Sequence, residues 1–133
     1  MEEQTVRDWM HPGVITCRPD TPVDQVAITI DEKDISALVV VDEADNAIGV
    51  ISRTDLVNAR FIQPYLKHWR GMSAEHLMSK PVIRVTPDVA IKEAVKLLRA
   101  RRIHRLVVVE EQAGHKRPVG ILSVTDLAKH TGG

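Results

Sequence analysis

Two short segments repeat one pattern of polar side chains that suits the binding of a sugar and a phosphate. The segments Ser52–Asp55 and Ser123–Asp126 each follow an apolar run and read Ser-x-Thr-Asp. A Ser followed three residues later by an acid is typical of a helix N-terminus, where side chain and backbone cap each other. A carboxylate at that place can also accept hydrogen bonds from both hydroxyls of a ribose. For Asp55 and Asp126 we therefore keep two interpretations open, sugar binding and capping alone.

The hydroxyls of these segments have a second use, because a helix N-terminus has free backbone N–H groups that favour anions. The side chains of Thr54 and Thr125 are placed to donate to a phosphate. The alternative for Ser52 and Ser123 is that they simply cap the helix that follows.

A basic pair precedes the second of these segments. His104 and Arg105 stand where a strand enters an apolar run, directly after Arg99, Arg101 and Arg102. A fork-shaped guanidinium beside an imidazole suits phosphate oxygens. The alternative is a solvated basic helix end that the helix dipole favours, and we prefer it for the three preceding arginines.

An internal repeat accounts for the two copies of this pattern. A shift of 68 residues places Met10 on Met78, and a shift of 71 places Gly49–Leu56 on Gly120–Leu127. We place the three extra residues of the second copy in a loop from Glu110 to Pro118, since insertions are tolerated best in loops. The predicted organisation is a first repeat over residues 3–60, a helical connector over 61–72 and a second repeat over 73–130.

Each copy predicts the same order of elements, β-α-β-β-α with a short helix in front. In the first copy, Val23, Val26, Ala27 and Ile30 follow the spacing of one helical face. The fold class is therefore α/β (α+β), with two repeats that bury their sheets against each other. The predicted elements are short helices near Thr5–Met10 and Ser73–Met78, short strands at Val14–Thr16 and Val82–Val85, strands at Ala37–Val41, Ala47–Ile51, Arg105–Val109 and Val119–Leu122, a helix with Thr21 as its cap and Pro22 in its first turn, and helices from Ser52 and Ser123.

The connector carries an apolar stripe, in which Phe61, Tyr65 and Trp69 are spaced by four. We expect this stripe to be buried, on the module or on a partner. A small module could hardly cover this stripe and the apolar side of its short helices by itself, so we expect a homodimer.

Composition excludes several classes of protein. Eighteen basic and eighteen acidic residues give no net charge, which argues against a general nucleic-acid binder. We expect no membrane span, no disulfide from the single Cys17, and no metal site from the scattered histidines. The acidic start does not resemble a signal peptide, so we expect a cytoplasmic protein.

Taken together, the repeated Gly-x-x-Ser-x-Thr-Asp-Leu motif resembles the signature of the cystathionine β-synthase (CBS) domain. The likeness covers roughly residues 3–130 and two domains in tandem, the arrangement called a Bateman module. Val6–Met10 and His76–Met78 also resemble the opening of that motif. Ile35–Val40 and Ile103–Val108 are similar to segments of the nucleotide-binding gamma subunit of AMP-activated protein kinase.

This resemblance implies two clefts related by a pseudo-twofold axis, which bind adenosine-containing ligands such as AMP, ADP, ATP or S-adenosylmethionine. It assigns ribose to Asp55 and Asp126, phosphate to Arg105, and nucleotide contact to the small pair Ser36 and Ala37. The base would lie against the first strands, although core packing explains those residues equally well. The full set of expected ligand-binding residues is Ile15, Ser36, Ala37, Thr54, Asp55, Ile83, His104, Arg105, Ser123, Thr125 and Asp126.

The resemblance favours a regulatory sensor that is not an enzyme and that needs no resident cofactor, only a regulatory adenine nucleotide. Its partners would be that small molecule, a second copy and an unidentified protein target, without nucleic acid or membrane. One rival is a structural dimerisation module with unoccupied clefts, against which the Asp in both copies argues. The other rival is a nucleotide hydrolase, for which we find no general base in the motif.

Overall fold

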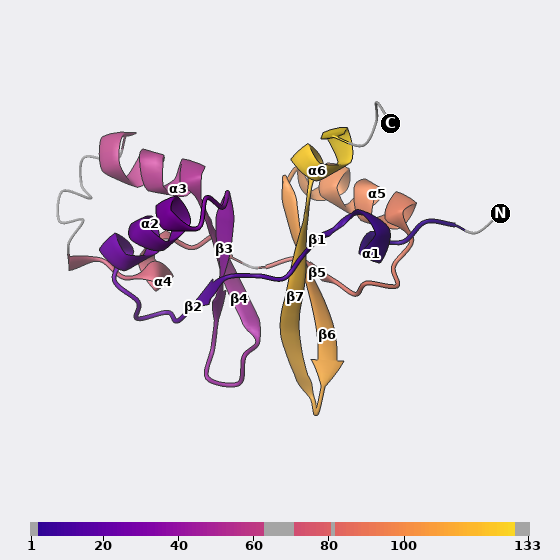
Figure 1. Cartoon of the computed structure of the whole chain (residues 1–133), viewed down its shortest axis with the longest axis horizontal. Helices are drawn as coiled ribbons and strands as arrows, with labels where there is room; N and C mark the ends of the chain where they lie inside the picture. Colours follow the sequence, from indigo (N-terminus) through magenta and orange to yellow (C-terminus); the bar gives the residue numbers. More distant parts are fainter. Residues whose placement is uncertain (1–2, 63–70, 81, 130–133) are drawn as a thin grey trace. The chain divides into compact units, whose positions relative to one another are not determined.

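The computed structural model describes residues 3–62, 71–80 and 82–129, which form two compact units. The first unit comprises Ile15–Val82, and the second comprises Met1–Val14 with Ile83–Gly133. Each unit has a mixed α/β architecture with its own sheet (Figure 1). The expected fold class of two α/β repeats is confirmed.

The first unit has a three-stranded sheet in the order β2-β3-β4. Strand β2 is parallel to β3, and β3 is antiparallel to β4. Helices cover one face of this sheet, because Val26 and Ile30 of α2 share a core cluster with Leu38 and Val40 of β3. The elements are β2 (Thr16–Cys17), α2 (Val23–Glu32), β3 (Ala37–Val41), β4 (Ala47–Ser52), α3 (Arg53–Val57), the π-helix η1 (Asn58–Ile62) and α4 (Ala74–Leu77).

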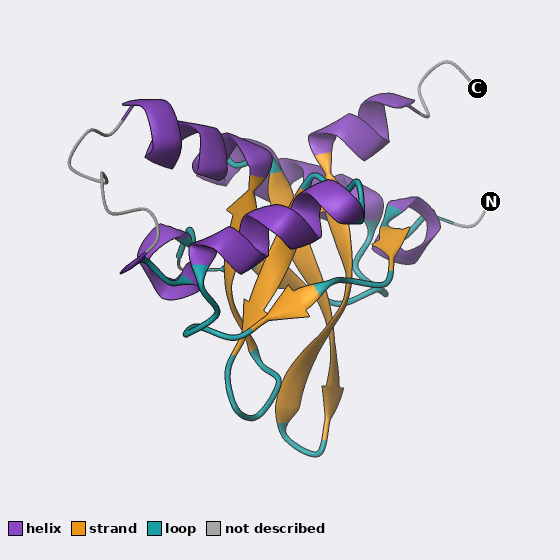
Figure 2. Ribbon diagram, turned by 60° about the vertical axis from the view of Figure 1, so that its left-hand side comes forward, coloured by secondary structure: helices purple, strands orange, loops and turns teal. Residues whose placement is uncertain are grey.

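The second unit has a four-stranded sheet in the order β1-β7-β6-β5. Its core repeats that of the first unit, with Ala94 and Leu98 of α5 against Leu106 and Val108 of β6. Figure 2 shows its hairpin of β6 and β7 as a long twisted ribbon. The elements are α1 (Val6–Trp9), β1 (His11–Pro12), β5 (Arg84–Val85), α5 (Ile91–Arg101), β6 (Arg105–Gln112), β7 (His115–Ser123) and α6 (Val124–Lys129).

Three expectations about elements are wrong. The insertion Glu110 to Pro118 is a continuation of the β6–β7 hairpin, with Glu110 paired to Arg117, because the residues Ala113 and Gly114 adopt positive φ and turn the chain tightly. Helix α2 begins at Val23 with Pro22 as its cap residue, so Pro22 lies outside the first turn. Thr21 does not cap it, since its hydroxyl accepts from the backbone N–H of Arg18 at 3.0 Å.

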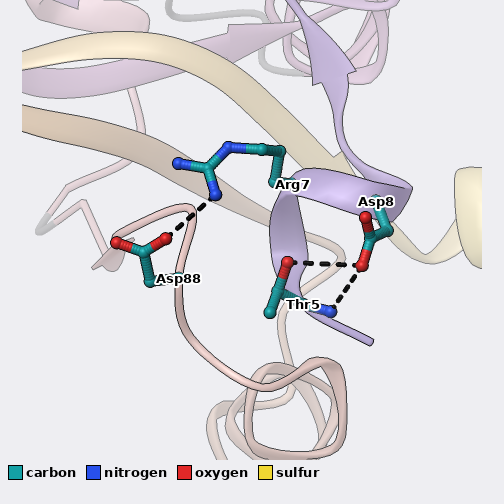
Figure 3. Close-up of polar contacts among 4 residues, drawn as sticks. All are labelled: Thr5, Arg7, Asp8 and Asp88. Atoms are coloured by element: carbon teal, nitrogen blue, oxygen red, sulfur yellow. Dashed lines mark hydrogen bonds and ion pairs between the residues drawn. The ribbon is translucent and has the colours of Figure 1, made fainter. Parts of the chain in front are cut away.

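The short opening helix of each sequence repeat belongs to the unit formed by the other repeat. Helix α1 lies in the second unit, where the backbone N–H of Val6 donates to the carbonyl of Val89 at 2.9 Å. Figure 3 shows the Arg7 guanidinium paired with Asp88 at 2.9 Å, and Asp8 accepting from the backbone N–H of Thr5 at 2.8 Å. Helix α4 lies in the first unit in the same way, with the N–H of Ala74 bonded to the carbonyl of Thr21 at 2.8 Å.

This exchange explains the glycine of the repeated motif. A Cβ on Gly120 would lie 2.8 Å from the carbonyl oxygen of His11 and 3.0 Å from the Sδ of Met10. A Cβ on Gly49 would collide with the side chain of Met78. At Gly120 the backbone of the opening segment itself crosses strand β7 so closely that a residue without a side chain fits best.

We predict that Gly120→Ala lowers the free energy of unfolding by about 1–3 kcal/mol, the usual cost of overpacking. The clash partner is a backbone oxygen, which cannot rotate away as a side chain can. Chemical denaturation measures the change. Gly71→Ala is the matched control, because a Cβ there meets nothing within 4 Å. Equal stability of the two variants would contradict the close crossing.

No helix in the part of the chain that the structure describes is both long and apolar enough to cross a bilayer. The connector prediction falls partly on residues 63–70, so Tyr65 and Trp69 lie outside the described residues. At its start, Phe61 is 73% exposed, so its side chain is not buried in this chain. Its ring lies beside the guanidinium of Arg60, whose Cζ is 5.6 Å from the ring centroid.

Candidate functional site

The expected site residues fall into two groups, one in each unit. Each group lies where the last strand of the hairpin ends and the following helix begins, and we call this place a corner. We call the first corner the group Ile15, Ser36, Ala37, Thr54 and Asp55 of the first unit. We call the second corner the group Ile83, His104, Arg105, Ser123, Thr125 and Asp126 of the second unit. The two corners are built from the same backbone contacts, as follows.

Three contacts assemble the first corner. Ala37, the first residue of β3, is paired with Ser52, the last residue of β4. The backbone N–H of Arg53 donates to the carbonyl of Ser36 at 3.0 Å, which holds the start of α3 against the start of β3. On the other side of β3, the carbonyl of Ile15 accepts from the N–H of Val39 at 3.0 Å.

The same three contacts recur in the second corner. Arg105 is paired with Ser123, and the N–H of Val124 donates to the carbonyl of His104 at 3.0 Å. The carbonyl of Ile83 accepts from the N–H of Val107 at 3.1 Å. The repeat in the sequence is therefore a repeat in backbone geometry, down to single hydrogen bonds.

Strand alternation decides where the side chains of the second corner point. Leu106 and Leu122 belong to the core cluster that includes α5. Successive side chains of a strand point to opposite faces, so Arg105 and Ser123 lie together on the face opposite α5. Arg105 is half-buried there, and His104 is exposed.

The capping expectation is confirmed in full at the first corner. The N–H of Asp55 donates to the Oγ of Ser52 at 3.1 Å, and the N–H of Ser52 donates to the Oδ2 of Asp55 at 2.9 Å. One carboxylate oxygen of Asp55 is thus used by the protein.

The second corner differs in this bond. The N–H of Asp126 donates to the Oγ of Ser123 at 3.1 Å, so Ser123 is the cap. Among residues 3–62, 71–80 and 82–129, no hydrogen bond or ion pair engages the Asp126 carboxylate. None of the described residues therefore engages either of its two oxygens.

The sequence did not mark Arg53 as a site residue, yet this residue makes the first corner different from the second. Its Nε donates to the carbonyl of Ile35 at 2.8 Å, and its Nη2 lies 3.2 Å from Asp34 Oδ1. The guanidinium thus donates to carbonyls at the end of α2 and just after it, and it is also paired with a carboxylate. The equivalent residue of the second corner is Val124, which is 44% exposed. Position in the repeated motif was the available signal, since Arg53 stands between the capping Ser52 and Thr54.

In the part of the chain that the structure describes, the cation of the second corner has no such acceptor. Within the described ranges, no hydrogen bond or ion pair engages the side chains of His104 or Arg105. The first corner therefore holds a guanidinium that is already bonded to a carbonyl and to Asp34, whereas none of the described residues engages the Arg105 guanidinium of the second corner, which could bind an anion.

Cys17, at the end of β2, packs against the core of the first unit. Burial raises the pKa of its thiol to about 11, an effect that a hydrogen bond with Thr21 only partly offsets. The thiol is therefore protonated at neutral pH and is a poor nucleophile. Among the described residues, no group of three or more His, Cys, Asp or Glu side chains is placed to hold a metal ion.

Comparison with known proteins finds the same repeat elsewhere. The family model described as "CBS domain" matches residues 6–61 and 74–133. An uncharacterised protein of Methanopyrus kandleri is 32% identical over 127 residues, which are 96% of this chain and 62% of the relative. The inosine-5'-monophosphate dehydrogenase of Methanocaldococcus jannaschii is 31% identical over 116 residues, 87% of this chain but 21% of that enzyme. The chain thus spans less than two thirds of either curated relative.

Solved structures share the fold. The structure of CBSX2 in complex with AMP has a TM-score of 0.75 and 28% identity, and the match covers 95% of this chain and 94% of that one. The CBS domain pair of MJ0100, solved with 5'-methylthioadenosine and S-adenosylmethionine, has a TM-score of 0.81. This match covers 98% of both chains. Because the sequence identity is 21%, it shows a shared fold and nothing more.

Proposed function

We propose that this chain, which belongs to the CBS domain family, is a regulatory module that binds an adenosine-containing ligand at its strand–helix corners. The observation that carries the proposal is the Asp126 carboxylate, which lies at a helix start beside Ser123 and whose oxygens bond to none of the described residues. A similar chain, CBSX2, has been solved with AMP, which supports this ligand class.

The residues of each corner suit one part of such a ligand. Asp55 and Asp126 would accept from the ribose hydroxyls, and the hydroxyls of Thr54 and Thr125 would donate to phosphate at the helix start. The backbone and side chains of Ile15 and Ile83 would hold the base, next to Ser36 and Ala37 in the first corner. The phosphate would favour the second corner, where Arg105 supplies positive charge next to the imidazole of His104. We propose AMP, ADP or ATP as the regulatory ligand, with no resident cofactor.

A thermal-shift screen of AMP, ADP, ATP, S-adenosylmethionine and NAD tests the function. A ligand at 100 times its dissociation constant should add about 2.7 kcal/mol to the free energy of unfolding. No shift with any of them, together with no copurified absorbance at 260 nm, would favour the rival structural module with unoccupied clefts. The proposal is for binding without turnover, so hydrolysis of ATP in the presence of Mg²⁺ would favour the rival enzyme.

We further propose that the module acts as a homodimer on an unidentified protein target in the cytoplasm, without nucleic acid or membrane. Large apolar side chains on the helices of the first unit support an association: Ile28 is 48% exposed, Val57 52% and Phe61 73%. Light scattering should give about twice the 14.8 kDa of one chain at micromolar concentration. A mass of one chain, with and without nucleotide, would refute the dimer.

A further inference from the structure

Arg53 joins the two halves of the first corner. One half is Ser36–Ala37, where β3 begins, and the other is Thr54–Asp55, in the first turn of α3. The backbone N–H of Arg53 donates to the carbonyl of Ser36 at 3.0 Å, and its Nε donates to the carbonyl of Ile35 at 2.8 Å. The main chain and the side chain of one residue thus hold the two halves together.

The same guanidinium also holds the turn that leads from α2 into β3. Its Nη2 donates to the carbonyl of Ile30 at 3.4 Å and lies 3.2 Å from Oδ1 of Asp34, a residue with a positive φ of 51°. The side chain of Asp34 is 97% exposed, so the ion pair by itself stabilises the fold little. We call the bonds of this guanidinium to Ile30, Asp34 and Ile35 the Arg53 tie. It fixes the backbone on both sides of the turn and so places Ser36.

The second corner has the same backbone without such a tie. Arg102 has a φ of 53° where Asp34 has 51°. The N–H of Val124 donates to the carbonyl of His104 at 3.0 Å, which repeats the backbone bond of the first corner. The side chain of Val124 has no donor, and among the residues that the structure describes none donates a side-chain hydrogen bond to the carbonyl of Ile103. The two corners therefore differ by one side-chain tie across matching backbones.

We propose that Arg53 is a positioning residue, which keeps the first corner in the shape that receives the nucleoside part of the ligand, whether or not a phosphate is attached. Its guanidinium is bonded to carbonyls of the chain and to Asp34, so it holds the corner without contacting the phosphate. A site that has the competent shape for only a fraction of the time binds its ligand more weakly by that fraction. This inference rests on the proposed function and adds the residue that gives the first corner its own ligand preference.

Removal of the tie tests the proposal. Asp126→Ala serves as the background, because the first corner should then supply the measured binding. In that background, Arg53→Val introduces the residue that the second corner has at this position. It should weaken the binding of adenosine and of AMP alike, by about three- to tenfold in calorimetry, because the competent fraction falls to about a third or a tenth.

Arg18→Val is the matched control in the same unit. The Nη1 of Arg18 donates to the carbonyl of Asp42 at 2.7 Å, which is again a bond from a guanidinium to a main-chain carbonyl. Arg18 and Asp42 directly follow the last residues of β2 and β3, whereas the corner contains the first residue of β3, Ala37. Any effect of the control is therefore on the stability of the unit, which chemical denaturation measures, and both affinities should stay unchanged.

Transfer of the tie to the second corner tests the proposal in the opposite direction. Arg102→Asp with Val124→Arg introduces the residues of the ion pair at positions with matching backbone. Val124 is 44% exposed, so a longer side chain has room there. In an Asp55→Ala background, this double variant should bind adenosine at least threefold more tightly than the background does. Adenosine is the probe because it is uncharged, so the altered charge near the corner has little effect on it.

Four results would overturn the positioning role. A loss for AMP alone would mean that Arg53 contacts the phosphate, and unchanged affinity for both ligands would mean that the tie does not shape the corner. Equal losses in Arg18→Val would assign the effect to the stability of the unit. Unchanged binding of adenosine by the transfer variant would also overturn the proposal, and this measurement decides alone if Arg53→Val does not fold.

The same titrations distinguish this inference from the function on which it rests. If the unaltered chain binds AMP but the Asp126→Ala background binds neither AMP nor adenosine, the first corner is not a site. The role of Arg53 is then wrong, while ligand binding by the module stands. If the unaltered chain binds none of the ligands of the thermal-shift screen, the proposed function itself is wrong.

Discussion

Asp126→Ala is expected to weaken the binding of AMP and of adenosine at least a hundredfold. Two hydrogen bonds from ribose hydroxyls to a carboxylate would be lost, and hydrogen bonds to charged groups contribute about 1.5–3 kcal/mol each. The fold should be nearly unaffected, since Ser123 supplies the cap and the Asp126 carboxylate bonds to none of the described residues. Isothermal calorimetry measures the affinity, and chemical denaturation of the free protein measures the stability.

The first corner provides the matched comparison. Asp55→Ala removes the bond from the Ser52 N–H, 2.9 Å long, and should therefore lower the free energy of unfolding by about 1 kcal/mol. Any loss of affinity in this variant reports occupation of the first corner. If Asp126→Ala leaves the affinity unchanged and lowers the melting temperature, then Asp126 serves the fold alone and the ribose assignment is wrong.

The elements that sequence patterns predicted well are those whose signal is local. Strand β3 has the predicted bounds Ala37–Val41, because an unbroken run of apolar residues marks a strand that is buried on both faces. The capping of α3 was predicted from Ser52 and Asp55 because both partners lie three residues apart in the chain. The similarity of the two corners followed from the repeat, since equivalent residues in equivalent elements meet the same neighbours.

The features that the sequence did not reveal depend on contacts between distant segments. The sequence shows Gly49 as a residue of the motif. It does not show that the side chain of Met78 lies so close that a Cβ on Gly49 would collide with it. The Arg53 guanidinium stabilises carbonyls about twenty residues earlier in the chain, and no local pattern marks such an acceptor. The Ser-x-x-Asp pattern also reads alike in both copies, although only the first forms the reciprocal bond. The Ser and Asp of the pattern therefore do not by themselves decide whether the reciprocal bond forms.

Because the two corners differ, Arg105 is the residue that we expect to bind the negatively charged phosphate of the ligand. Its partner in the strand pair is Ser123, so its side chain lies on the same sheet face as the capping hydroxyl and near the helix start that favours anions. The first copy has Ala37 at this place, and its nearby cation, Arg53, is already bonded to Ile35 and Asp34. Of the two corners, the second is therefore the one that offers a phosphate a guanidinium, that of Arg105, with which no described residue pairs.

Arg105→Gln is accordingly expected to weaken the binding of AMP, ADP or ATP by roughly ten- to a hundredfold, and to leave adenosine nearly unaffected. Gln keeps much of the length and the hydrogen-bonding capacity but removes the charge and the fork, and a hydrogen bond to a charged group contributes about 1.5–3 kcal/mol.

Parallel titrations of AMP and adenosine measure the difference in affinity. The control is Arg101→Gln, which changes an exposed arginine at the end of α5 and should alter the affinity for neither ligand. Higher salt should reduce the effect only in part, because a half-buried pair is screened less than an exposed one. Equal losses for AMP and adenosine would mean that Arg105 shapes the corner without contacting phosphate, and no loss for either would mean that it is solvated.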